Sequence, residues 1–195
     1  MSRAGIVRNR TAATLFVLST VPLAWAQGGT PPGGAPPSGG ATTSVTYYAT
    51  YKLDGGAAAQ TNQSYSATAA DTSGVWVADS GALALNNPTI LTSGNTSSQD
   101  NSSFYGLNAG LLVTSGSAAV TGGSIATSGT GANGAFATGS ASTLTLSNLS
   151  ISGAADGAHA VIATQGGTVN IANVTMSTTG GSSSPSSSRN RPKGG

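Results

Sequence analysis

The segment Ser142–Ile151, with the sequence STLTLSNLSI, decides how this chain folds. Leu144 and Leu146 alternate with polar neighbours, so they share one face of a strand. A polar break follows at residues 147–148, after which two further aliphatic residues again share a face. The segment predicts a strand, a turn and a second strand. Strands this short cannot bury their apolar faces alone, so they need stacked neighbours of the same kind.

Four imperfect copies of this unit occur between Gly74 and Gly180. The first strands are Leu83-Ala84-Leu85, Ala118-Ala119-Val120, Leu144-Thr145-Leu146 and Val169-Asn170-Ile171, and the next apolar residues in register are Ile90, Ile125, Ile151 and Met176. The offsets between copies are 35, 26 and 25 residues. Such repeats are typical of a coil that stacks on itself. We therefore expect an all-β fold in which about four coils stack in parallel, about 4.8 Å apart.

The turn of each copy carries its own column of residues. Asn87, Gly122, Asn148 and Asn173 occupy equivalent positions. Asn tolerates left-handed backbone angles and can hydrogen-bond to the next Asn of a stack, whereas Gly supplies only the angle. We predict an asparagine ladder interrupted at Gly122. The alternative is that Asn stands there only because it is common in turns.

Composition limits the possible functions. With 195 residues, of which 37% are hydrophobic, the chain suits one domain with a thin core. Among residues 44–181, Lys52 is the single base against five aspartates, a net formal charge of −4. This balance excludes the basic stripe that nucleic-acid binding needs. The absence of Cys excludes disulfides, thiol catalysis and cysteine zinc sites.

The first 43 residues predict export. Residues 1–26 combine three arginines, an apolar run and Ala24-Trp25-Ala26, which is the order of a cleavable signal peptide. The alternative, an uncleaved anchor helix, is disfavoured because the apolar run is short and Pro22 interrupts it. Residues 27–43 are rich in Pro and Gly and predict a linker. We expect a secreted or cell-surface protein with no membrane span after cleavage.

Three further segments complete the predicted organisation. Residues 44–73 are expected to form N-terminal cap strands, with an edge strand at Val45–Tyr51 and a second strand at Ser64–Thr68. Residues 74–181 hold the β-helix repeats. Residues 182–195 are rich in Ser and carry three bases, so we expect a disordered basic tail.

The repeat, the turn asparagines and the leader resemble the right-handed parallel β-helices of the pectate-lyase-like superfamily. Within it they are most similar to repeat segments of bacterial autotransporter and adhesin passengers. The resemblance covers residues 74–180 and implies a short right-handed parallel β-helix with disordered termini. Lyases of this fold use an Arg or Lys base with acidic Ca²⁺ ligands, and the coil region contains neither base.

The acidic residues of the coils do not predict an active site. Asp79, Asp100 and Asp156 each stand alone in a loop, whereas glycoside hydrolysis needs paired carboxyls. Asp156 and His159 are the best catalytic candidates, as an acid and its polarising partner. We favour the alternative of a turn aspartate and a solvated histidine, because acid–base work needs a positioned partner. The ligand count is also too small for Zn²⁺ or Ca²⁺. We therefore predict no catalytic, cofactor-binding or metal-binding residues, and no cofactor.

Hydroxyl side chains are expected to form a column on one outer face. This column consists of Thr89, Ser124, Ser150 and Thr175, and a second column two residues on consists of Leu91, Ala126, Ser152 and Ser177. A flat array of Thr can bind ice, but half of the second column is apolar. Ice binding is therefore a less favoured hypothesis.

These observations favour a non-catalytic, exported, adhesin-like interaction protein. The partners that this hypothesis implies are cell-surface glycans or other surface proteins, and the open ends of a stack imply self-association as well. A polysaccharide-active enzyme using Asp156 and His159 is the alternative. A third hypothesis is a truncated repeat fragment without independent activity.

Overall fold

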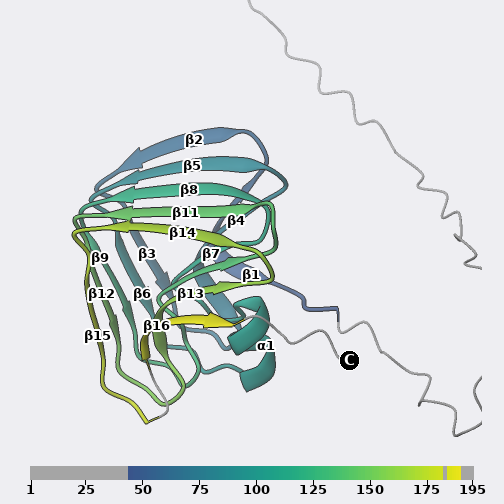
Figure 1. Cartoon of the computed structure of the whole chain (residues 1–195), viewed down its shortest axis with the longest axis vertical. Coiled ribbons are helices and arrows are strands. Elements are labelled where there is room, and N and C mark those ends of the chain that lie inside the picture. Colours follow the sequence, from purple (N-terminus) through teal and green to yellow (C-terminus); the bar gives the residue numbers. More distant parts are fainter. Residues whose placement is uncertain (1–43, 182–183, 190–195) are drawn as a thin grey trace, which may run out of the picture. The chain divides into compact units, whose positions relative to one another are not determined.

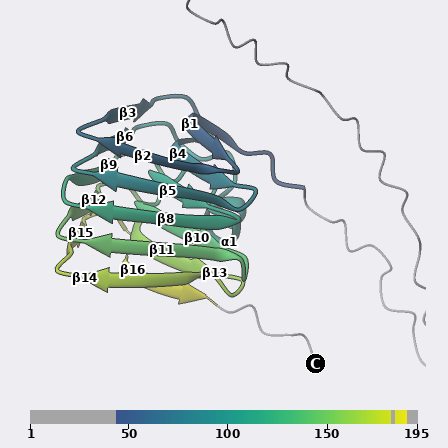
Figure 2. The same cartoon turned by 90° about the horizontal axis from the view of Figure 1, so that it is seen from above.

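The computed structural model describes residues 44–181 and the backbone of residues 184–189. These residues form a parallel β-solenoid of about 5 turns with one short helix. Figure 1 shows the coils wound around a common interior, and Figure 2 shows the strands of successive coils stacked in layers. The predicted signal peptide (1–26) and linker (27–43) lie outside the described residues.

Each coil contributes one strand to each of three parallel sheets. Sheet A consists of β1 (Tyr48–Asp54), β4 (Thr72–Ala78), β7 (Leu111–Val113), β10 (Ala135–Thr138), β13 (His159–Thr164) and β16 (Ser184–Arg189). Sheet B consists of β2 (Ala57–Thr61), β5 (Gly81–Asn86), β8 (Gly116–Thr121), β11 (Ser142–Ser147) and β14 (Thr168–Ala172). Sheet C consists of β3 (Ser64–Ala67), β6 (Thr89–Thr92), β9 (Ser124–Thr127), β12 (Ser150–Gly153) and β15 (Thr175–Thr178).

The strand register confirms the predicted repeat. Leu146 pairs with Val120 on one side and with Ile171 on the other. In sheet C, Ile151 pairs with Ile125 and Met176 in the same way. Alternation along each strand turns these aliphatic side chains inward, where they form one continuous core. Residues about 25 positions apart therefore lie over one another.

The stack begins earlier than the sequence indicated. Residues 48–67 are a complete coil, because β1, β2 and β3 pair in parallel with β4, β5 and β6. The expected cap strands are therefore the first coil itself, although β1 is an edge strand as predicted. The repeat was hidden because β2 (AAAQT) contains only Ala at its apolar positions. The last strand also extends the stack, since β16 lies in the segment expected to be disordered and pairs with β13.

Glycine lines the inner side of sheet A where isoleucine projects from sheet C. A Cβ on Gly74, Gly110 or Gly134 would lie 2.6, 2.6 and 2.4 Å from the Cγ2 atoms of Ile90, Ile125 and Ile151, respectively. Any side chain there would overlap the isoleucine of the same coil. The glycines thus let two sheets approach closely, which is how so narrow a solenoid keeps a packed interior.

The turn between sheets B and C is the predicted left-handed bend. Asn62, Asn87, Asn148 and Asn173 have φ of 52–54°, and Gly122 has φ 70°. The Asn87 amide donates to Asn62 Oδ1 at 2.8 Å, and the Asn173 amide donates to Asn148 Oδ1 at 3.3 Å. Gly122 separates the two bonds. The asparagines therefore stack as an interrupted ladder, exposed on the outside of the bend.

A helix explains the long first offset of the repeat. The α1 helix (Gln99–Tyr105) is inserted between β6 and β7. The Ser98 side chain caps the N-terminus of the helix by accepting a hydrogen bond from the backbone N–H of Asn101. Gly106 ends the helix with φ 79°. Beneath it, the outer side of sheet A carries a second apolar cluster containing Leu112, Phe136 and Ile162. The helix thus covers a face that would otherwise expose large apolar side chains.

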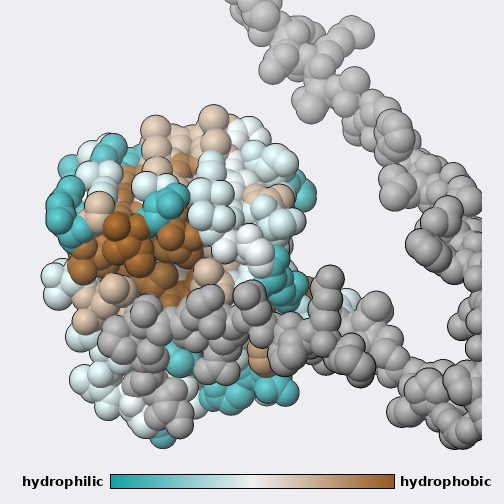
Figure 3. Space-filling view, viewed as in Figure 1, coloured by the Kyte–Doolittle hydropathy of each residue, from teal (hydrophilic) through white to brown (hydrophobic). Residues whose placement is uncertain are grey.

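The final coil leaves core positions open to solvent. Val169, Val174 and Met176 are half-buried, and Ile171 is 43% exposed, whereas its register partner Leu146 is fully buried. Figure 3 shows apolar side chains gathered on this face, around β14 and β15. The solenoid therefore ends on an apolar cross-section.

Candidate functional site

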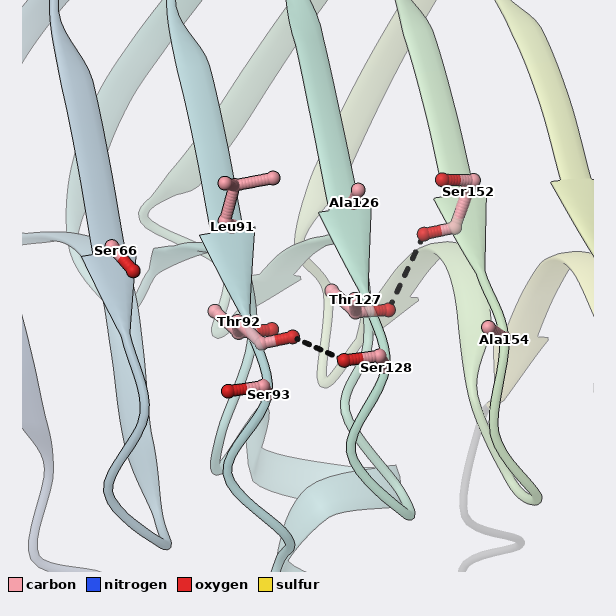
Figure 4. Close-up of a pocket in the computed structure, with 9 residues that line it drawn as sticks. All are labelled: Ser66, Leu91, Thr92, Ser93, Ala126, Thr127, Ser128, Ser152 and Ala154. Carbon is pink, nitrogen blue, oxygen red and sulfur yellow. Dashed lines mark hydrogen bonds between the residues drawn. The ribbon is translucent and has the colours of Figure 1, made fainter.

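A hollow in the described surface lies on the outer face of sheet C, near the ends of its strands. It has a volume of about 370 Å³ and is shallow and open. Its lining is uncharged and mixes small apolar side chains with hydroxyls: Ser66, Leu91, Thr92, Ser93, Ala126, Thr127, Ser128, Ser152 and Ala154. These residues belong to β3, β6, β9 and β12 and to the loops that follow the last three, and Figure 4 shows them side by side.

Strand alternation makes Leu91 the apolar centre of this hollow. Ile90 is buried in the core, so the next residue, Leu91, points outward and is 46% exposed. Its register partner Ala126 is small and leaves space beside the leucine. An exposed leucine next to an alanine on a flat sheet forms a shallow apolar contact area.

Hydroxyl groups surround this apolar area in regular columns. The predicted column of Thr89, Ser124, Ser150 and Thr175 is confirmed by the register, and Ser64 extends it into the first coil. The second predicted column, Leu91, Ala126, Ser152 and Ser177, is also in register. The five strands of sheet C contain no Asp, Glu, Lys, Arg or His. The outer face of sheet C is therefore neutral and rich in hydroxyls.

Several of these hydroxyls are available for a ligand. Ser128 Oγ donates to the Thr92 carbonyl and Thr127 Oγ1 to the Ala132 carbonyl, so these two are engaged. The hydroxyls of Ser93 and Ser152 have no hydrogen-bond partner among the described residues. Since a hydroxyl can donate and accept, such groups suit a neutral polar ligand.

The structure assigns a structural role to Asp156. Its carboxylate accepts a hydrogen bond of 2.6 Å from the backbone N–H of Gly181, in the next coil. Asp71 does the same for the N–H of Ser97, and the Asn95 side chain does so for Thr130. These acceptors satisfy loop N–H groups that have no strand partner. Asp156 thus belongs to a set of loop caps.

His159 differs from the sequence expectation. We expected a solvated histidine, but His159 lies in β13 and is only 4% exposed. Its backbone N–H donates to Asn133 Oδ1 at 3.0 Å, beneath the helix. The reason is that β13 is covered on both of its faces, with Val161 in the main core and Ile162 in the second apolar cluster. No local pattern around residue 159 indicates this burial.

The buried polar residues beneath α1 were also missed by sequence reasoning. Asn133 donates to Ser102 Oγ at 3.0 Å and to the Ser102 carbonyl, while Asn108 donates to the Gly94 carbonyl. These bonds tie the inserted helix and its loop to the stack. The only signal was the nine or ten extra residues in the first offset, which require an insertion of some kind.

Charges gather at the first coils rather than at the hollow. Lys52 contacts Asp54 at 2.9 Å and lies 4.2 Å from the centre of the Trp76 ring. The hydrogen bond from Lys52, with a second one to Asp79, lowers the pKa of Asp54 below its usual value. Because the pair is exposed, it stabilises the fold little. No group of three or more His, Cys, Asp or Glu that could hold a metal occurs within the described part of the chain.

Burial affects the ionisation of two tyrosines. It raises the pKa of Tyr47 to about 12, with a further contribution from Tyr105. The Tyr47 hydroxyl donates to the Tyr105 carbonyl, so Tyr47 joins the first coil to α1. Burial also raises the pKa of Tyr65, which packs against Tyr51 at the start of the stack. Both tyrosines thus pack against neighbouring elements of the fold.

Comparison with known proteins adds no relative. No protein-family model, curated protein or solved structure matches this chain. The class that fold and surface define is therefore a parallel β-solenoid with a neutral, hydroxyl-rich face. In the described segments, no helix is both long and apolar enough to cross a membrane.

Proposed function

We propose that this protein is a non-catalytic, adhesin-like interaction module, exported to the cell surface or the extracellular space, that binds neutral glycans. The observation that carries this proposal is the uncharged outer face of sheet C, with its hollow around Leu91. The export rests on the leader-like sequence of residues 1–26. The adhesin-like class rests on the resemblance to the passengers of pectate-lyase-like β-helices.

The chemistry of the face suits sugars. Neutral sugars combine hydroxyl groups with small apolar C–H surfaces. Leu91 and Ala126 offer a contact for such a surface, and Ser93 and Ser152 offer hydrogen bonds beside it. The hydroxyl column led by Thr89 continues from coil to coil along the axis of the stack, so an extended glycan would meet hydroxyl groups on several coils. A repeated weak contact gives useful avidity without a deep pocket.

Catalysis is the less favoured function because its best candidates are otherwise engaged. Asp156 accepts the Gly181 N–H, and His159 is buried in β13. An acid whose carboxylate is held by the backbone and a buried imidazole offer no positioned pair to a substrate.

A glycan array and a cell-adherence assay with the full chain test the proposal. We expect binding to neutral glycans that Leu91→Asp reduces by at least about tenfold, because it places a charge in the apolar contact. Ala119→Asp is the matched control, since Ala119 is exposed on the outer face of sheet B. The proposal is wrong if the chain binds no glycan, or if both variants bind like the parent.

A further inference from the structure

At the C-terminal end of the solenoid, no further described strand covers the last coil in sheets B and C. Sheets B and C end at β14 and β15, which have a partner strand on one side only among the described residues. The core position Ile171 is 43% exposed there. An open parallel edge beside exposed core side chains is a surface to which a further strand pair can add.

The N-terminal end carries hydrogen-bonding groups that are complementary to those of the C-terminal end. In the asparagine ladder, each later residue donates its amide to the Oδ1 of the earlier one. Asn173 Oδ1 therefore accepts from no described residue, and the Asn62 amide donates to none. A second copy placed below the last coil would bring its Asn62 amide to Asn173 Oδ1. The two ends thus match in polarity.

Residues 27–43 do not match this apolar end in composition. They contain no Val, Ile, Leu, Met or aromatic residue. The first coil of another copy does, because Tyr51, Leu53 and Tyr65 belong to the core or pack against it.

One strand stands in the way of this stacking. Sheet A has a sixth strand, β16, which occupies the edge of β13 that β1 of a second copy would need. In register, Ser186 and Ser188 of β16 pair with Val161 and Ala163. In the first coil, the corresponding partners of Val75 and Val77 are Tyr51 and Leu53. Strand β1 thus brings apolar residues to positions where β16 brings serines, and it would bury more apolar area there.

We propose that the C-terminal end is a docking surface for a second copy of this chain, and that β16 is a strand cap which the incoming β1 replaces. In the docked state, β2 and β3 of the second copy pair with β14 and β15. The contact joins unlike ends, so it does not close and can be repeated into a filament. With β16 paired to β13, the stack is shielded and the chain stays monomeric.

Sedimentation velocity and light scattering over a concentration series test this proposal. We compare the full chain with a chain ending at Gly181 and with the full-length variant Ser188→Pro, which weakens β16. The full chain is expected to be mainly monomeric. Both altered chains are expected to form assemblies that grow beyond a dimer as concentration rises. Circular dichroism verifies that each retains its strands.

Two substitutions in the chain ending at Gly181 locate the contact. Ile171→Lys is expected to abolish assembly, because it places a charge in the stacked core. Leu91→Lys is the matched control. It replaces a similarly exposed leucine, but on the outer face of sheet C, and assembly should be unchanged. The proposal is overturned if the folded Ser188→Pro and shortened chains remain monomeric, if assembly stops at a dimer, or if Leu91→Lys abolishes assembly and Ile171→Lys does not.

Discussion

At the scale of single residues, burial depends on the layer in which a residue lies. Leu146 and Ile171 are register partners with similar side chains, yet Leu146 is fully buried and Ile171 is 43% exposed. The difference arises because a coil lies on both sides of Leu146, whereas β14 ends its sheet. Identical chemistry therefore contributes unequally to stability in the middle and at the end of the stack.

This difference predicts unequal effects of truncation to alanine. Leu146→Ala should lower the free energy of unfolding by about 2–5 kcal/mol, the usual range for a buried leucine. Ile171→Ala should cost clearly less, because much of its surface is already in water. Urea unfolding followed by circular dichroism measures both. Equal losses would show that the last coil is as well packed as the fourth.

The buried Tyr47 predicts a pH dependence at high pH. Its pKa in the folded state, about 12, lies above the ordinary value of 10.0. A raised pKa means that its contribution to stability is fully present below about pH 10 and is lost as pH rises through about 12. In an absorbance titration of the five tyrosines, one should ionise with a midpoint near 12. Tyr47→Phe should remove that step, and an unchanged late step would contradict the assignment.

At the scale of elements, the repeat in the sequence predicts most of the strands but neither the first coil nor the α1 helix. The strands from β5 to β15 that carry Leu, Ile or Val at alternate positions were predictable, because a period of two within a period of about 25 fixes both face and register. The first coil was missed because β2 has only alanines at these positions. The α1 helix was missed because its sequence, QDNSSFY, has no apolar periodicity and is stabilised by its caps and contacts.

The candidate site was predictable only in part. The two columns led by Thr89 and Leu91 follow from register, so the sequence placed them correctly. The hollow around Leu91 depends on the depth of side chains along the strand ends, which no local pattern encodes. His159 was misplaced for a related reason, since its burial follows from the covering of both faces of β13, which its own sequence does not indicate.

The capping of α1 gives a prediction at the scale of the element. Ser98→Ala removes the hydroxyl that accepts a hydrogen bond from the backbone N–H of Asn101. It should lower the free energy of unfolding by about 1 kcal/mol. Hydrogen exchange should become faster in residues 99–106, while the strands of sheets B and C keep their protection. Ser97→Ala is the matched control, because no described hydrogen bond uses the Ser97 side chain. Equal exchange in the two variants would mean that the cap does not hold the helix.

At the scale of the whole molecule, one organisation accounts for core, surface and ends. In-register stacking places Ile over Ile in the interior, Asn over Asn at the bend and hydroxyl over hydroxyl on the outer face. The same stacking produces open ends, since a coil satisfies its edges only through its neighbours. The proposed glycan-binding face and the proposed docking end are both consequences of this repeat.

Disulfide formation between register partners tests the stacking most directly, because the chain has no Cys of its own. Thr145 and Asn170 are exposed partners on β11 and β14, so Thr145→Cys with Asn170→Cys should crosslink quickly on mild oxidation. The matched pair Thr145→Cys with Ala172→Cys is offset by two residues, beyond disulfide reach, and should not crosslink. Mass spectrometry of the digested monomer identifies the bond. Crosslinking of the offset pair in preference to the register pair would contradict the fold.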